Sequence, residues 1–586
     1  MDIRKFDNWK EDFRPCGLLY FTQRIEEMLN PFTDHVFKMP VLNTALLVDE
    51  YLDNAEFVKA KTIDENHLTH IMEEFYFSFE NDVVIEKFIE KAQRERILHK
   101  LKELSKREFK DYSECKAIMD YLKIILRNYI EWSKAFLYET ISKDKDIKII
   151  EHGIRCFIPG MVSFGYSKSF IYRLNVELFN IKQVDSFSSL NLFLERFDYT
   201  KRDYDIYMAI DSGALQFQSV LEKRLFIDFG PFPDEMGIQF DKEKYILTKI
   251  KVSALDEYSA VQEAYDHLNI FFTYYCFLAD RTENWFFNDS KVVDSEKVVY
   301  SIPIRNHKLC RKMPKDAKHL ANDSDTIILE LQNKKPSYNQ INRALRLHNT
   351  AINESDVKNK FLNLWSTIEI LFVSDKDKSK ILEIKEKMLP VLLKDYLCYQ
   401  FISIDSAIRT IAKQVTMNDI ENKFPDEDKS AWPYYIVALD KYSEQRKQLC
   451  ELLSNYPLLK YRIISLSDLC KDKKKLKGEL YKHSDRVSWH IYRLYRARNT
   501  IIHSGFIPNN LQELVEHLHS YVDQCFYEIL NILVFNSELN SISNALIESQ
   551  LRKDEVYTLL DIQSPLCRSD LITILKYCYI HLEPSP

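Results

Sequence analysis

Glycine is scarce in this sequence, with only 9 in 586 residues. The sequence contains no GxGxxG and no GxxxxGK[ST] pattern, so the glycine-rich loops that commonly hold nucleotide phosphates are absent. The same scarcity disfavours β-barrels built on glycine turns. Hydrophobic residues make up 46% of the chain and aromatic residues 13%. This supply can fill large cores, and the length predicts about three or four domains rather than one.

The sequence also lacks a recognisable set of metal ligands. Its 11 cysteines are scattered singly, without a CxxC pair, which argues against a zinc site and against a disulfide framework. His67, His70, Glu73 and Glu74 have ligand-like spacing, but the chain suggests no further ligand for them. A surface helix explains these four residues better. We therefore expect no metal ion and no other cofactor.

Long apolar runs are missing as well. The N-terminus, MDIRKFDNWKEDF, is charged and aromatic, unlike a signal peptide, and Leu268–Leu278 is too short to span a bilayer. These absences predict a cytoplasmic protein without membrane contact. The net charge of -7, from 81 basic and 88 acidic residues, excludes a surface that coats nucleic acid throughout. Any RNA must therefore bind at a local basic surface.

The spacing of apolar residues changes along the chain. Residues 1–145 predict helices, and residues 146–325 predict a strand-rich α/β region in which turn formers separate β-branched and aromatic runs. A polar linker is expected at residues 314–325. Strands are predicted at Arg155–Ile158, Ser169–Leu178, Asp205–Ile210, Arg224–Phe229, Tyr245–Val252 and Val298–Ile304.

Helical spacing dominates the rest of the chain. We expect a helical bundle in residues 326–540 and a helical extension in residues 541–586. The predicted fold class is therefore multidomain and predominantly α, with a central α/β region. The expected helices of the C-terminal half include residues 356–373, 380–396 with an interruption at Pro390, 484–503, 511–535 and 570–582.

The most informative segment reads SWHIYRLYRARNTIIHSG, Ser488 to Gly505. Its apolar residues have helical spacing, and Gly505 is a helix stop signal, so His503 is predicted to lie in the last turn. Asn499 precedes His503 by four residues and shares its face of the helix, with Arg498 beside it. Cleavage of RNA at a 2′-hydroxyl needs a base, which histidine supplies near neutral pH. It also needs a cation for the phosphate oxygens, which arginine supplies without any metal.

The residues Arg498–His503, RNTIIH, match the RN-x-x-x-H signature of HEPN ribonucleases. The flanking Tyr495 and Gly505 also resemble the RN-containing helix of that family. Upstream, residues 362–369, LNLWSTIE, resemble the first helix of the ApeA-type branch, which occurs in bacterial anti-phage, abortive-infection proteins. The resemblance covers residues 339–535 and leaves the N-terminal part unmatched.

This resemblance implies a helical HEPN bundle that pairs with a second copy to form one composite cleft. It implies metal-independent endoribonuclease activity that leaves a 2′,3′-cyclic phosphate. Arg498 and His503 would be catalytic, Asn499 would orient them, and Glu369 would be a supporting contact to the same helix. The expected partners are cellular or phage RNA, a second copy of the chain or a higher homo-oligomer, and a phage-derived trigger.

Other interpretations stay open at this point. Arg486, Arg493 and Arg496 either hold RNA phosphates or are solvated or salt-bridged, and the basic run Lys471–Lys477 in a predicted loop is more simply a solvated cluster. His503 taken alone would be a favourable partner for the helix dipole. A HEPN-like bundle used only for RNA binding or dimerisation is the main alternative, and a protein scaffold is a third.

Two further observations bear on the motif. The spacing Arg-x4-His recurs at Arg94–His99 and Arg343–His348, where neither Asn nor the glycine stop accompanies it. We interpret both as coincidences on charged helices. Trp365 is most simply a core residue, and Glu369 on the same helix needs a partner. An arginine from residues 486–498 is the expected one.

Overall fold

The computed structural model divides the chain into two compact units. Unit 1 comprises Met1–Gly160, Gln183–Ser186 and Leu309–Pro586, and unit 2 comprises Met161–Lys182 and Phe187–Lys308. Unit 1 thus combines helices from the sequence ranges 1–145, 326–540 and 541–586. The residues that the structure describes are 8–30, 33, 36–106, 112–230, 232, 238, 240–279, 286–304, 331–332, 334–374, 379–412, 417–425, 429, 431–536 and 538–576.

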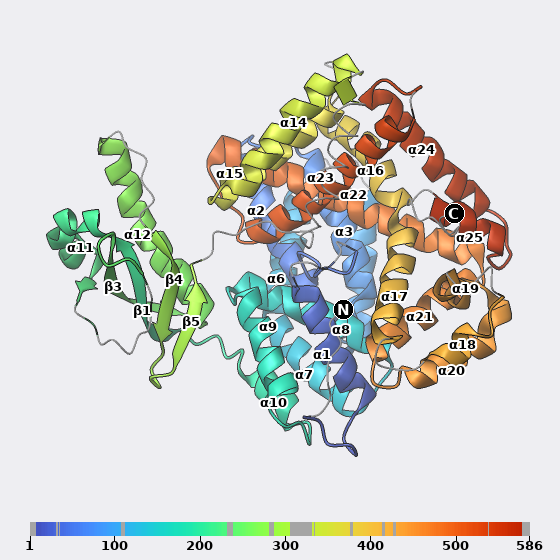
Figure 1. The fold of residues 1–586 in the computed structure, drawn as a ribbon, viewed down its shortest axis with the longest axis horizontal. Helices are drawn as coiled ribbons and strands as arrows, with labels where there is room; N and C mark the ends of the chain where they lie inside the picture. Colours follow the sequence, from blue (N-terminus) through green and yellow to red (C-terminus); the bar gives the residue numbers. More distant parts are fainter. Residues whose placement is uncertain are drawn as a thin grey trace. The chain divides into compact units, whose positions relative to one another are not determined.

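Unit 1 is built from helices (Figure 1). From the N-terminal part of the chain come α1 (Cys16–Leu29), α2 (Thr44–Lys59), α3 (Asn66–Asn81), α4 (Val83–Phe88), α5 (Lys91–Lys106), α6 (Tyr112–Ile125), η1 (Leu126–Asn128), α7 (Tyr129–Ser142) and most of α8 (Ile147–Phe164). From the C-terminal part come α14 (Lys335–Asn353), α15 (Val357–Phe372), α16 (Lys380–Lys394), α17 (Tyr396–Ala412), α18 (Asn418–Glu421), α19 (Trp432–Ala438), η6 (Asp440–Tyr442), α20 (Ser443–Leu452), α21 (Pro457–Cys470), α22 (Lys473–Ser504), α23 (Leu511–Phe535), α24 (Ile542–Leu559) and α25 (Arg568–Lys576).

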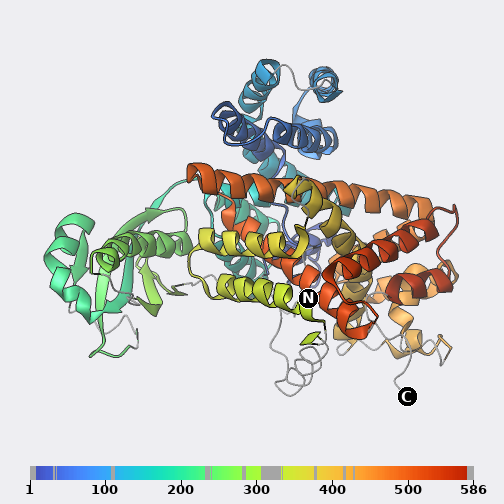
Figure 2. The same cartoon turned by 90° about the horizontal axis from the view of Figure 1, so that it is seen from above.

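Helix α22 is the central helix of unit 1. It begins where the Asp472 side chain accepts a hydrogen bond from the backbone N–H of Lys474, at 3.0 Å. It ends at Gly505, whose positive φ of 71° and N–H bond to the Ile501 carbonyl close the last turn. In Figure 2 the long orange helix lies between the blue N-terminal helices and the yellow α14 and α15. It packs against α3 on one side and against α15, α16 and α23 on the other.

A single apolar core joins α22 to the helices of its bundle. Trp365 and Ile368 on α15, Leu494 on α22, and Val515 and Ile529 on α23 are almost completely buried in it. Trp365 and Ile368 are three residues apart, and Val515 and Ile529 are fourteen residues, or about four turns, apart, so each pair lies on one apolar stripe of its helix. A second core fills the space among α17 to α21, the first part of α22 and the C-terminal helices α24 and α25.

Unit 2 contains a five-stranded antiparallel sheet in the order β2-β3-β1-β4-β5. In the longest pairing Ile206 of β1 lies opposite Ile250 of β3. Helix α12 lies across the sheet in Figure 1 and buries Ala260, Ala264 and Leu268 against it. The elements of this unit are α9 (Lys168–Val176), η2 (Glu177–Ile181), α10 (Ser188–Glu195), β1 (Arg202–Asp211), η3 (Ser212–Phe217), α11 (Gln218–Leu225), β2 (Ile227–Phe229), β3 (Tyr245–Ala254), α12 (Glu257–Ala279), β4 (Phe286–Val293) and β5 (Val299–Pro303).

The structure confirms a mainly helical chain with a strand-rich central part, but two predicted strands are wrong. Residues 155–158 lie in α8, and residues 169–178 lie in α9 and the turn that follows it. In α8, the side chains of Ile150, Ile154, Phe157 and Ile158 are all buried, and their spacing is that of a helix. The β-branched and aromatic composition of both segments suggested strands, while their apolar period was that of a helix. The predicted strand Arg224–Phe229 is correct only for its last three residues, which form β2. The sequence predicted no strand where β4 lies.

Part of the C-terminal half differs from the sequence-based expectations. The predicted loop at residues 471–477 is wrong from Lys473 onward, because α22 begins there. Helix α16 continues through Pro390 without interruption. The predicted linker at residues 314–325 and the end of the predicted helix beyond residue 576 lie outside the described residues.

Within the described part of the chain, no helix combines the length and the apolar character that crossing a bilayer requires.

Candidate active site

The end of α22 carries the three residues of the RN-x-x-x-H motif. Arg498 is half-buried, Asn499 is buried, and His503 is exposed in the last turn before Gly505. The helix end therefore lies where the sequence predicts it. This position leaves the His503 imidazole open to solvent, while the side chains of Arg498 and Asn499 are partly or fully buried in the bundle.

Arg498 is oriented by contacts on both of its sides. Its Nη2 lies 3.6 Å from Oε1 of Glu369 on α15, and its Nη1 donates to Oδ1 of Asn499 at 3.1 Å. The same Glu369 oxygen accepts a hydrogen bond from Nε1 of Trp365 at 2.9 Å. The expectation that Glu369 pairs with an arginine of residues 486–498 is confirmed. Trp365 is buried, as predicted, and it also fixes the carboxylate that holds Arg498.

His503 has a different environment. Among the described residues, no side chain hydrogen-bonds its ring. Large apolar side chains next to it in the sequence are also exposed: Ile502 is 48% exposed, Phe506 40% and Ile507 51%. An exposed imidazole can exchange protons with a ligand, and exposed apolar groups around it provide a surface for a protein contact.

Arg493 and Arg496 are buried in an ion-pair network, which we call the α2–α3–α22 network. Arg493 donates to both carboxylate oxygens of Glu50 on α2, at 3.0 and 2.9 Å, and to Glu74 on α3 at 2.6 Å. Arg496 donates to Glu50 at 2.8 Å. Only 5% of Arg493 and 2% of Arg496 is exposed. Of the two interpretations left open by the sequence, the structure supports salt bridging for these arginines rather than a place on an RNA-binding surface.

The network shifts the pKa values of its carboxyl groups in opposite directions. Burial favours the neutral form of Glu50, but the positive charges of Arg493 and Arg496 outweigh it and lower the pKa of Glu50 to about 2. Burial raises the pKa of Glu74, and the negative charge of Glu50 adds to this effect. Glu50 is therefore the principal counter-charge of the two guanidinium groups.

The surface helix expected for these four residues is correct only in part: Glu73 is exposed, while the other three face α22 to different degrees. His67 is buried, and Glu74 pairs with Arg493. The His70 ring stacks on Tyr492 of α22 with centroids 3.7 Å apart. Burial lowers the pKa of His67 to about 4. His67, His70 and Glu74 contact α22. The four residues do not form a compact group of potential metal ligands.

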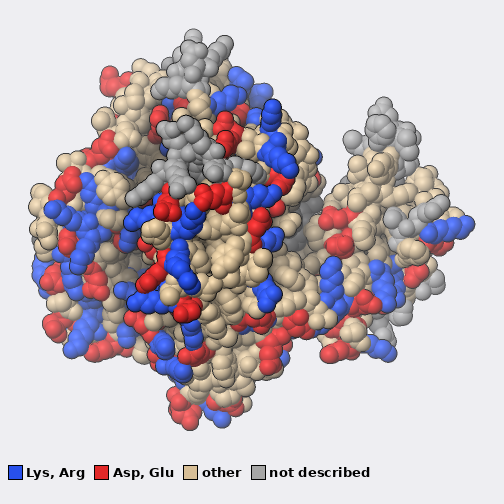
Figure 3. All heavy atoms as spheres, turned by 180° about the vertical axis from the view of Figure 1, so that it is seen from behind, with Lys and Arg blue, Asp and Glu red and all other residues tan. Residues whose placement is uncertain are grey.

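The remaining predicted basic residues include both exposed and buried side chains, and Lys473 is buried. Arg486 is exposed. In the run at residues 471–477, Lys473 forms an ion pair with Asp570 at 2.8 Å, and Lys477 forms one with Asp561 at 2.5 Å. On the face visible in Figure 3, basic and acidic side chains are interspersed. This face carries no extended region of one charge sign.

Sequence reasoning missed a second cluster in the same bundle. His348 on α14 lies beside His519 and Asp523 on α23, and potential ligand atoms of the three residues lie within 4.8 Å of one another. The spacing of His519 and Asp523, four residues apart, was a visible signal of a shared helix face. Their partner His348 lies far away in the sequence, so that spacing could not identify it.

Comparisons with known proteins identify no relatives. No protein-family model, no curated protein and no solved structure matches the chain. The family resemblance of the α22 motif therefore stays a prediction that rests on the residues themselves.

We expect Glu50→Gln to destabilise unit 1 by about 3–5 kcal/mol, because it removes the principal counter-charge of two buried guanidinium groups. The pKa of Glu50 is lowered from 4.5 to about 2 in the folded protein, so the folded state favours the ionised form. Its stabilisation is complete above pH 4.5 and is lost as the pH falls towards 2. Urea unfolding followed by circular dichroism should show that the parent and the variant converge over this range.

Glu56→Gln is the matched control, because Glu56 lies on the same helix α2 and pairs with Lys116 at the surface. We expect this variant to unfold like the parent at pH 7, since exposed ion pairs contribute little. Equal destabilisation by both substitutions would contradict the importance of the network.

Proposed function

We propose that this protein is a metal-independent endoribonuclease of the HEPN type that acts in anti-phage defence by abortive infection. The observation that carries the proposal is the arrangement at the end of α22. Arg498 is held by Glu369 and Asn499, and the exposed His503 lies in the last turn of the same helix. An oriented cation and an accessible imidazole are the two groups that the reaction needs.

In the proposed reaction His503 accepts the proton of an RNA 2′-hydroxyl. The 2′-oxygen then attacks the adjacent phosphorus, and the bond from phosphorus to the 5′-oxygen of the next nucleotide breaks. The products are a 2′,3′-cyclic phosphate and a 5′-hydroxyl, which takes its proton from the protonated His503 of the second copy of the chain. Arg498 offsets the negative charge that builds up on the phosphate oxygens.

The proposed cleft is formed by two copies of the chain. Arg498 and His503 are five residues apart, which places them roughly 140° apart around one helix. A single α22 therefore directs the two side chains to different sides, whereas two helix ends can bring the arginine of one copy to the histidine of the other. Ile502, Phe506 and Ile507 surround His503 in the sequence and are exposed, which favours a protein contact at this position.

The N-terminal helices offer a physical route for control by a phage-derived trigger. Helix α2 contacts α22 through Glu50, and its Phe57 ring packs against Phe506, with centroids 5.1 Å apart. Phe506 follows His503 closely in the sequence. A change in the position of α2 would thus reach the helix end directly, so the proposal places the sensing function in the N-terminal part of the chain.

The alternative function is a HEPN-like module that binds RNA or dimerises without cleaving. The burial of Arg493 and Arg496 favours it, because it removes two cations from the surface on which RNA would lie. The alternative predicts that the purified protein shifts RNA on a gel or forms dimers while RNA length stays unchanged.

The central test is RNA cleavage by Arg498→Ala and His503→Ala variants, assayed by gel electrophoresis in the absence of added metal. We expect each substitution to lower the cleavage rate by about 10²–10⁴-fold, since each removes a cation or a base from the transition state. The cyclic phosphate ends should disappear with the activity. Toxicity of the expressed protein in cells should fall in parallel.

The double variant Arg94→Ala/His99→Ala is the matched control, because it removes the same Arg-x4-His spacing from α5. It should cleave RNA like the parent. If the Arg498 and His503 variants remain as nucleolytic and as toxic as the parent, the assignment of the chemistry is wrong. If the parent shifts RNA but leaves it intact, the non-catalytic alternative is correct.

A second test concerns Glu369 as a positioning residue. Glu369→Gln keeps the size of the side chain but removes the negative charge beside Arg498. We expect kcat to fall by about 10-fold with little change in KM, because substrate still binds while the guanidinium is less well oriented. Cleavage kinetics under multiple turnover measure this split. A rise in KM at constant kcat would instead place Glu369 in RNA binding.

A further inference from the structure

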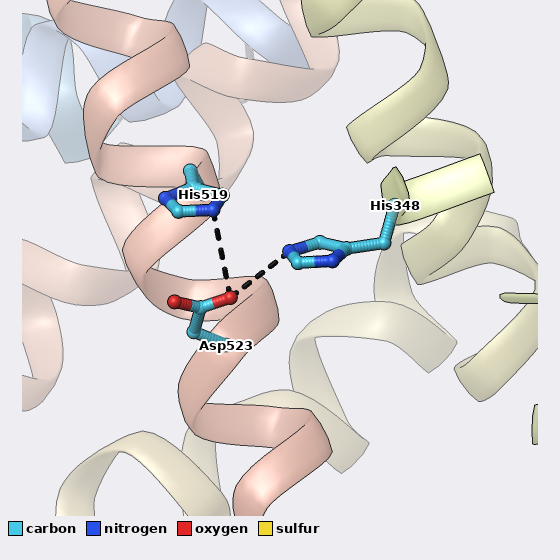
Figure 4. A group of neighbouring side chains, drawn as sticks. All are labelled: His348, His519 and Asp523. Carbon is cyan, nitrogen blue, oxygen red and sulfur yellow. Dashed lines mark hydrogen bonds and ion pairs between the residues drawn. The ribbon is translucent and has the colours of Figure 1, made fainter. Parts of the chain in front are cut away.

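Three side chains from two helices converge between α14 and α23 (Figure 4). Nε2 of His348 lies 2.9 Å from Oδ1 of Asp523, and Nε2 of His519 lies 3.6 Å from the same oxygen. Dashed lines in the picture join one nitrogen of each imidazole to the same carboxylate oxygen. We call this set the His348–His519–Asp523 cluster.

The cluster is held in place by its surroundings. The two imidazole rings are stacked, with centroids 5.2 Å apart and planes 5° from parallel, and the His348 ring also contacts Phe526 edge-on. His519 and Asp523 are one helical turn apart on α23. Between 7% and 15% of each side chain is exposed. The ligand atoms are therefore nearly fixed, yet solvent reaches the group.

We propose that the His348–His519–Asp523 cluster binds one divalent transition-metal ion of the zinc class, with water completing the coordination. Four ligands about 2.0–2.1 Å from zinc in a tetrahedron are separated by roughly 3.3 Å. The two distances to the Asp523 oxygen, 2.9 and 3.6 Å, bracket this value, and all three ligand atoms lie within 4.8 Å of one another. Imidazole ligands select zinc, cobalt or nickel over magnesium or calcium, which prefer oxygen ligands throughout.

The proposed ion has a structural consequence. His348 lies near the C-terminal end of α14, whereas His519 and Asp523 lie within α23. A bound ion would cross-link these two helices of the bundle and would bind the folded chain in preference to the unfolded one. This site is separate from the motif on α22 and does not rest on the proposed nuclease function.

The experiment uses the full chain purified without a polyhistidine tag and freed of metal by dialysis against a chelator. We expect the parent to bind one equivalent of Co²⁺ with the visible absorption of a tetrahedral or five-coordinate ion and without a thiolate charge-transfer band. Zn²⁺ should displace the cobalt and raise the melting temperature. His348→Gln, His519→Gln and Asp523→Asn should each weaken Co²⁺ binding by at least about 10-fold and abolish the shift in melting temperature.

His267→Gln is the matched control, because His267 and Glu263 on α12 are also four residues apart and lie 3.7 Å from each other at the surface. This variant should bind cobalt like the parent. The proposal is overturned if the parent binds no Co²⁺, if binding survives in the His348→Gln/His519→Gln double variant, or if a thiolate band shows that cysteines hold the ion. Should the variants fail to fold by circular dichroism, the spectrum of the parent alone decides between imidazole and thiolate ligands.

The two proposals can fail independently. Asp523→Asn should lose the metal but retain RNA cleavage at temperatures well below its melting point and at protein concentrations high enough for two copies to pair. His503→Ala should lose cleavage but retain the metal. Loss of metal binding in His503→Ala would contradict the separation of the two sites.

Discussion

The α2–α3–α22 network is the interaction on which the arrangement of unit 1 depends. Two buried guanidinium groups require nearby negative charge, because an unpaired buried ion costs several kcal/mol. Glu50 and Glu74 supply it from helices more than 400 residues away in the sequence. The network therefore fixes the N-terminal helices on the helix that carries the motif. Arg498 lies nearer the end of α22 and forms no part of this network. Its charge is therefore not neutralised by Glu50 or Glu74.

The helix with the motif could be predicted from the sequence because its signals are local. Apolar spacing and Gly505 place the end of α22 and the exposed position of His503, and an acidic residue beside Trp365 predicts an arginine partner. The partners of Arg493 and Arg496 could not be predicted, because one sequence carries no information on which distant helices meet. The His348–His519–Asp523 cluster was missed for the same reason. In α8 and α9 the error was local, since composition was given more weight than period.

Histidine shows how strongly the surroundings decide the role of a side chain in this bundle. His70 stacks on Tyr492 and helps to pack α3, whereas His503 is exposed at a helix end and can carry a proton. His348 and His519 face one carboxylate and have the arrangement of metal ligands. Spacing alone did not separate these cases. The Arg-x4-His pattern at residues 343–348 has no part in the proposed cleavage of RNA, yet its histidine belongs to the His348–His519–Asp523 cluster.

The two proposed sites are connected through the chain that joins α22 to α23. A short loop after Gly505 contains Phe506 and Ile507, and α23 begins directly beyond it at Leu511. One end of this loop is fixed by the packing of α22, and the other by the packing of α23 against α15. An ion that cross-links α14 to α23 would hold the second end more firmly. The apolar surface beside His503 would then be presented by two fixed helices, which lowers the entropy lost when a second copy packs against it.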